Sequence, residues 1–217
     1  TDKHVLVTGA GRGMGREAAL GAAREGARVT VVDINAADGA DTVKAIGAAG
    51  GAAIFARADV TRAADCAAMV EAAEAAHGPV TAAYVNAAVQ LVGQDARAHE
   101  LSEEIWDRTL SINLKGMWLS CKYVLASMLK AGGGSLVLAG SPTGLKGAAG
   151  YTAYASSKAG SFALARTIAA DYARDKIRCN VLVPGPMRTP LTTDLFNDPD
   201  FLAATLKYSI TGRIGEA

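Results

Sequence analysis

Apolar and β-branched runs alternate with Ala-rich helical stretches along most of the chain. The runs predict strands at residues 5–8, 29–33, 53–56, 80–85, 135–139 and 177–183. The stretches between them predict helices at residues 13–25, 36–48, 62–76, 102–129 and 152–174. Strands separated by helices of this length form a parallel sheet that is covered on both faces. We therefore expect one doubly wound, Rossmann-like α/β domain over residues 1–217.

Composition and charge narrow the class of protein. Half of the 217 residues are hydrophobic, and the formal net charge is +1 without a block of like charge. This balance indicates neither a nucleic-acid nor a membrane partner. No apolar run approaches the roughly 18–20 residues of a membrane helix, and the N-terminus leads directly into an apolar strand. We therefore expect a cytoplasmic protein without a signal peptide.

Three cysteines, Cys66, Cys121 and Cys179, are widely separated along the chain. Their spacing fits neither a metal-ligand pattern nor a disulfide framework. The sequence therefore predicts buried, reduced thiols and no metal site.

A glycine-rich segment joins the first predicted strand to the first predicted helix. Gly9, Gly11, Gly13 and Gly15 occupy alternate positions there. Glycine lets the backbone turn tightly and approach a pyrophosphate, and the helix N-terminus offers free N–H donors and a partial positive charge. A plain structural turn also uses glycine, but this placement favours a dinucleotide site.

Asp33 ends the second predicted strand, about 20 residues beyond the glycine-rich segment, where an acid can bind the adenosine ribose. Its carboxylate would accept hydrogen bonds from the 2′- and 3′-hydroxyls and would repel a 2′-phosphate. Arg12 favours the opposite cofactor preference, because a cation beside the segment could help to bind a phosphorylated cofactor. Asp33 should lie nearer to the ribose, so we expect NAD.

From Val5 onward the chain resembles the short-chain dehydrogenase/reductase family. The segment from Thr8 to Gly15 is similar to that family's Thr-Gly-x-x-x-Gly-x-Gly loop. Asn86-Ala87-Ala88 resembles its Asn-Ala-Gly segment, with Ala88 where glycine is usual. Together with the ribose argument, the resemblance implies this cofactor-binding set: Gly9, Gly11, Arg12, Gly13, Met14, Gly15, Asp33, Asp59, Val60, Asn86, Ala87, Ala88, Tyr154, Lys158, Pro184, Gly185, Met187 and Thr189.

The chemistry of carbonyl reduction requires a proton donor, and alcohol oxidation requires a base. Tyr154 and Lys158 stand four residues apart, on one face of a predicted helix, so that the ammonium can favour the phenolate. Tyr151 lacks such a partner. Ser141, after the fifth strand, can donate a hydrogen bond to the substrate oxygen, or it can be an ordinary turn residue.

The family resemblance implies a catalytic tetrad of Asn113, Ser141, Tyr154 and Lys158. It also implies that Asn113 distorts its helix locally and holds a water that links Lys158 to solvent. Asn is a poor helix former in any case.

The region after the sixth strand contains three prolines between residues 184 and 190, which predict a shaped loop. By resemblance, residues of about 186–210 cover the substrate. Leu195, Phe196, Phe201 and Leu202 would either line an apolar pocket or pack the cover itself. The family's usual seventh strand is absent from this sequence. Either the protein is short, in which case the sheet edge is open and assembly is weaker than in intact relatives, or the protein continues beyond Ala217.

The leading functional hypothesis is hydride transfer between NAD(H) and a secondary alcohol or ketone of small size. An NADP-dependent reductase of acyl thioesters or sugars is an alternative, and a non-catalytic nucleotide-binding homologue is another. The resemblance further implies a homo-oligomer, a dimer or a homotetramer, with faces on the helices at residues 102–129 and 152–174.

Overall fold

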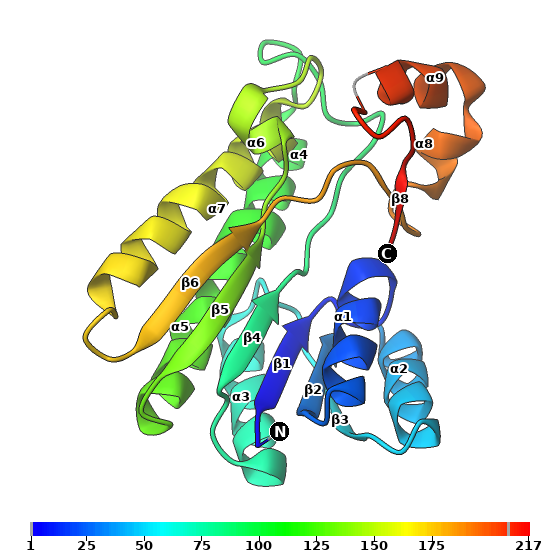
Figure 1. Ribbon diagram of the computed structural model, residues 1–217. Coiled ribbons are helices and arrows are strands. Elements are labelled where there is room, and N and C mark those ends of the chain that lie inside the picture. The colour runs from blue at the N-terminus through cyan, green and yellow to red at the C-terminus, as the bar shows by residue number, and fades with distance from the viewer. Residues whose placement is uncertain (1, 208) are drawn as a thin grey trace.

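The chain folds around a six-stranded parallel sheet. The computed structural model describes residues 2–207 and 209–217, so Thr1 and Tyr208, which belongs to the predicted cover, lie outside the described residues. The sheet has six strands in the order β3-β2-β1-β4-β5-β6. Their bounds are β1 His4–Thr8, β2 Arg28–Asp33, β3 Ala52–Arg57, β4 Ala82–Val85, β5 Gly134–Ala139 and β6 Ile177–Leu182. The doubly wound fold and its six strands are confirmed (Figure 1).

Helices cover the sheet on both sides (Figure 1). On one face α1 (Gly13–Arg24) and α2 (Ala36–Ala48) pack over β1 to β3, around a core that includes Ala19 and Ile46. On the other face lie α3 (Ala63–His77), α5 (Gly116–Lys130) and α7 (Thr152–Asp171). Their larger core includes Met69, Met128 and Ile168. All three cysteines are buried as free thiols, as expected.

The helix predicted at residues 102–129 consists of three segments. It begins as α4 (Glu103–Leu110), passes through a π-helical turn, η1 (Ser111–Lys115), and continues as α5. The Ser102 hydroxyl caps it by accepting a hydrogen bond from the Ile105 N–H at 3.3 Å. The π turn holds one extra residue in the helical path, and Asn113 lies in its centre. The helix is therefore distorted where the resemblance implied it.

Several predicted boundaries differ by two or three residues. β4 begins at Ala82 and not at Val80, because the Val80 N–H donates to the Ser127 hydroxyl of α5 at 2.9 Å. α7 ends at Asp171 and not at residue 174, because the chain turns through Lys176, at φ 57°, into β6. Neither difference moves a candidate site residue.

The C-terminal region lies beyond the carboxyl ends of the strands (Figure 1). The proline-containing loop carries a short strand, β7 (Met187–Arg188), which pairs in parallel with β8 (Gly215–Glu216). Two short helices, α8 (Thr193–Asn197) and α9 (Pro199–Lys207), form the segment predicted to be the cover. A further short helix, α6 (Thr143–Lys146), precedes α7.

Candidate active site

A cleft of about 590 Å³ opens at the carboxyl ends of the strands. Ligands of doubly wound sheets bind at this edge. Thirteen of the predicted site residues line it: Gly9, Arg12, Gly13, Met14, Asp33, Asp59, Val60, Asn86, Ala87, Ala88, Tyr154, Lys158 and Thr189. The remaining ones are absent from the described lining: Gly11, Gly15, Asn113, Ser141, Pro184, Gly185 and Met187.

The glycine-rich segment is tied to the end of β4. The Thr8 hydroxyl accepts hydrogen bonds from the N–H groups of Asn86, at 3.0 Å, and Ala87, at 3.2 Å. The Asn86 amide in turn donates to the carbonyls of Thr8 and Gly9, each at 3.2 Å. Asn86 therefore holds the segment in shape, in addition to lining the cleft.

Two glycines allow the segment to pack against itself. Gly9 has a φ of +64°, a conformation that L side chains rarely adopt. A Cβ at Gly15 would lie only 2.1 Å from the Gly9 carbonyl oxygen, so the absence of a side chain at Gly15 lets α1 pack directly against the segment. The N-terminus of α1 is left without a cap from any described side chain. Such an end, beside the cleft, suits an anionic group such as a pyrophosphate.

Asp33 presents its carboxylate to the cleft at the end of β2. One carboxylate oxygen accepts a hydrogen bond from the Gly11 N–H at 2.8 Å, and the other accepts one from the Asn35 N–H at 2.9 Å. The carboxylate is therefore held in place before a ligand arrives. Gly11 thus orients Asp33, although Gly11 itself does not line the cleft.

Asp59 and Val60 form a turn after β3. The Asp59 carboxylate accepts hydrogen bonds from the Thr61 N–H at 2.9 Å and from its hydroxyl at 2.7 Å. Val60 packs closely on α5, where a Cβ at Gly116 would lie 2.8 Å from the valine methyl group. Ala88 fits without strain, because Lys176 alone among the non-glycine residues of the described ranges has a positive φ.

Tyr154 and Lys158 lie one helical turn apart on α7 and both line the cleft. The Lys158 Nζ is 5.8 Å from the centre of the Tyr154 ring and donates a hydrogen bond to the Ala139 carbonyl at 2.9 Å. Lys158 is only 3% exposed, and burial lowers the pKa of its ammonium to about 8.

Burial also raises the pKa of Tyr154, and the nearby Ser141 hydroxyl offsets part of this rise. Ser141 itself exchanges a hydrogen bond with the Thr143 hydroxyl at 2.8 Å. The direction at Tyr154 is the opposite of the one expected from its lysine neighbour alone, because both groups are desolvated. In the protein by itself, Tyr154 is a neutral phenol, which is the state of a proton donor.

Asn113 connects three segments around Tyr154. Its amide N–H donates to the Val89 carbonyl at 2.8 Å and to the Ser157 hydroxyl at 3.1 Å, and its carbonyl accepts from the Val89 N–H at 2.8 Å. Ser157 in turn donates to the Tyr154 carbonyl at 2.7 Å. Asn113 therefore positions the turn of α7 that carries Tyr154.

Asp95 positions the start of α7, and sequence reasoning missed it. Its carboxylate accepts hydrogen bonds from the Ala153 N–H at 3.1 Å and the Tyr154 N–H at 2.9 Å, at the start of α7. It anchors the loop after β4 to the helix that carries Tyr154. A capping residue usually directly precedes its helix, so no local pattern identifies one that is 59 residues away.

Two aromatic residues of the predicted cover pack on each other. Phe196 is 6% exposed, and its ring centre lies 6.0 Å from that of Phe201. Neither phenylalanine is among the described lining residues of the cleft, and neither are Leu195 and Leu202. Of the two hypotheses, lining of the pocket and packing within the cover, the structure favours packing within the cover. Pro190 and Leu191, by contrast, line the cleft.

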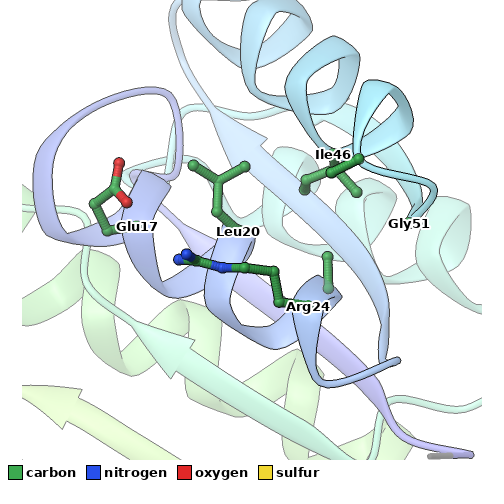
Figure 2. Close-up of a pocket in the computed structure, with 7 residues that line it drawn as sticks. Glu17, Leu20, Arg24, Ile46 and Gly51 are labelled. Carbon is green, nitrogen blue, oxygen red and sulfur yellow. The ribbon is translucent and has the colours of Figure 1, made fainter.

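A second hollow lies between α1 and α2, near the amino ends of the strands (Figure 2). Its lining includes the apolar residues Leu20 and Ile46 and the charged residues Glu17 and Arg24. It contains none of the predicted site residues.

Within the described ranges, no group of three or more His, Cys, Asp or Glu side chains is arranged to hold a metal ion. No helix in that part of the chain is long and apolar enough to cross a membrane.

Comparison with known proteins agrees with this geometry. Residues 3–200 match the family model described as short chain dehydrogenase. The chain is 35% identical to a cyclohexanol dehydrogenase of Acinetobacter sp. over 99% of its own length and 83% of the relative. It is 36% identical to a (3R)-3-hydroxyacyl-CoA dehydrogenase of Mus musculus, over 86% of this chain and 74% of the relative.

Solved structures give the same result. The fold superposes on that of levodione reductase with a TM-score of 0.91 and 31% identity, over 100% of this chain and 86% of the other. A short-chain type dehydrogenase/reductase from Mycobacterium ulcerans superposes with a TM-score of 0.95 and 27% identity, over 100% of this chain and 79% of the other. The chain belongs to the short-chain dehydrogenase family and is an oxidoreductase that acts on CH–OH groups with a nicotinamide dinucleotide.

Proposed function

We propose that this enzyme transfers a hydride between NAD(H) and a secondary alcohol or the corresponding ketone, with Tyr154 as the proton-transfer group. The observation that carries the proposal is that Tyr154 and Lys158 line the same cleft as the carboxylate of Asp33. A proton-transfer group and a ribose-binding acid thus belong to one site.

The residues of the chain have distinct roles in this proposal. In reduction, the neutral phenol of Tyr154 donates its proton to the substrate oxygen, and Ser141 donates a hydrogen bond to the same oxygen as negative charge develops. In oxidation Tyr154 accepts the proton, and the nearby Lys158 ammonium stabilises the phenolate. When bound, the nicotinamide supplies or accepts the hydride and, in its oxidised form, adds a positive charge to the site. Asp33, the N-terminus of α1 and Thr189 bind and orient the dinucleotide.

Turnover with a panel of substrates tests the proposal. The similar proteins named above guide the panel towards alicyclic alcohols and ketones and hydroxyacyl thioesters, and sugars are added to test the alternative reductase. NADH absorbance should report turnover with at least one secondary alcohol or ketone. Activity only with NADPH on thioesters or sugars would favour the alternative reductase. Tight NAD binding without any turnover would favour a non-catalytic homologue.

We expect NAD to bind more tightly than NADP, because the fixed Asp33 carboxylate accepts ribose hydroxyls and repels a 2′-phosphate. Asp33→Ser should weaken NAD binding. It should also narrow the preference for NAD over NADP by about tenfold, which corresponds to one lost charged contact. Isothermal titration with both dinucleotides measures the two affinities. Equal or tighter binding of NADP by the wild type would contradict the assignment of NAD.

We also propose that the enzyme is a homo-oligomer, a dimer or a tetramer, that associates through α4, α5 and α7. Ala159 and Ala163 are exposed one turn apart on α7, where small side chains permit close helix packing. Trp118 on α5 is 46% exposed, and Trp106 on α4 is 38% exposed. Light scattering at micromolar concentration should give two or four times the mass of the chain. The mass of a monomer would overturn this proposal.

The segment of residues 186–210 is proposed as the substrate cover. It lies at the carboxyl edge of the sheet, and its first residues, Thr189, Pro190 and Leu191, line the cleft. Limited proteolysis with and without dinucleotide tests this role, because a cover should become more protected when the cleft is filled.

A further inference from the structure

Arg12, at the N-terminus of α1, forms an ion pair with Asp38. Its guanidinium donates two hydrogen bonds to Asp38 of α2, one from Nε and one from Nη2, the latter at 3.1 Å. The Arg12 side chain is 61% exposed and the Asp38 side chain 21% exposed. Both residues line the cleft. Arg12, the cation that could help to bind a phosphorylated cofactor, is therefore already in an ion pair with an acidic residue.

Asp38 is held firmly in the first turn of α2. Its N–H donates to the Asn35 side chain, which caps the helix, at 3.3 Å. Its carbonyl accepts a hydrogen bond from the Thr42 hydroxyl at 3.1 Å, and the same hydroxyl contacts the Ala10 carbonyl at 3.0 Å. Thr42 is completely buried. The buried Thr42 hydroxyl thus connects the start of α2 to the glycine-rich segment and fixes Asp38 beside it.

Gly11 brings the two acids together. A Cβ at Gly11 would lie 2.7 Å from the Asp38 Cβ and 2.8 Å from an Asp33 carboxylate oxygen. Because Gly11 has no side chain, Asp33 and Asp38 can both pack against it. Asp33 and Asp38 therefore both line the cleft beside Gly11.

We propose that Asp38 is a second determinant of dinucleotide specificity, which holds Arg12 in an ion pair and so keeps it from a 2′-phosphate. This inference rests on the proposed dinucleotide function of the cleft. Asp33 acts by contact and repulsion, whereas Asp38 acts through Arg12. Exposed ion pairs are weak, so the pair biases the position of Arg12 and does not lock it.

Binding measurements on the whole enzyme test the inference without relying on turnover. Asp38→Asn keeps the size of the side chain and removes its charge. We expect it to tighten NADP relative to NAD by about two- to fivefold, as measured by isothermal titration, with NAD affinity changed by less than about twofold. Asp41→Asn is the matched control, because Asp41 is an exposed acid on the same helix, and it should leave the ratio unchanged.

A second variant isolates Arg12. In the double variant Arg12→Ala with Asp38→Asn, the gain in NADP affinity should disappear. The inference is overturned if Asp38→Asn leaves the ratio of affinities unchanged, if the gain persists without Arg12, or if Asp41→Asn produces the same gain. These outcomes are separate from those for the proposed function, because a change in the ratio is measurable whichever dinucleotide the wild type prefers. Failure to bind either dinucleotide would instead refute the proposed function itself.

Discussion

Replacement of Tyr154 by Phe is expected to lower turnover by about 10²- to 10⁴-fold, the usual contribution of a general acid or base. The substitution removes one hydroxyl from a partly buried ring, so the fold and dinucleotide affinity should remain close to those of the wild type. Steady-state kinetics together with dinucleotide titration measure both effects. Wild-type turnover in this variant would show that Tyr154 is not the proton-transfer group, and loss of dinucleotide binding would show that its role is structural.

Tyr151→Phe is the matched control. The two rings are neighbours, with centres 6.5 Å apart, but Tyr151 precedes α7 and the residue four positions further on is Ala155. It therefore lacks a lysine one turn away, and its hydroxyl should be dispensable. If Tyr151→Phe is the inactive variant, the site has been assigned to the wrong tyrosine.

The pH dependence should differ between the two directions. Burial raises the pKa of Tyr154, so the phenol is neutral at ordinary pH and ready to donate a proton in reduction. Oxidation needs the phenolate, so its rate should rise as the pH increases through the pKa of Tyr154, while the reduction rate should fall there. Burial lowers the pKa of the Lys158 ammonium to about 8, so Lys158→Met should slow oxidation most below about pH 8, where the ammonium is charged and stabilises the developing phenolate.

Replacement of Gly15 by Ala is expected to disrupt the dinucleotide site. The new Cβ would lie 2.1 Å from the Gly9 carbonyl oxygen and 2.7 Å from the Asn86 amide nitrogen, so the glycine-rich segment must move. We expect a loss of about 1–3 kcal/mol in the free energy of unfolding, as for other overpacked sites. Dinucleotide affinity should fall by at least about tenfold, because the displaced segment no longer shapes the N-terminus of α1.

Gly21→Ala provides the control for Gly15→Ala. Gly21 lies on the same helix, and a Cβ there would meet no described heavy atom within 4 Å. Alanine favours the helix over glycine, so this variant should gain about 0.5–1 kcal/mol in stability and bind the dinucleotide normally. Thermal unfolding and titration compare the two variants. Equal behaviour of both would mean that the glycine-rich segment is not packed as tightly as the structure has it.

The sequence by itself determined the features that depend on neighbouring residues. The helix predicted at residues 36–48 coincides with α2, because its Asn35 cap and its periodicity are local signals. The doubly wound class follows from alternating strands and helices with right-handed crossovers, whereas the strand order came from the structure. Tyr154 and Lys158 share a helix face because of their spacing alone, but the family resemblance was needed to assign them to a site.

Only the tertiary structure decided what depends on segments far apart in the chain. Asp95 reaches the Tyr154 N–H across 59 positions, and Asp38 pairs with Arg12 across 26. Burial raises the pKa of Tyr154 in the protein by itself, and burial results from packing that no local spacing reveals. Helical and strand periodicity act within one element, whereas hydrogen bonds between elements and desolvation exist only once the chain has brought those elements together.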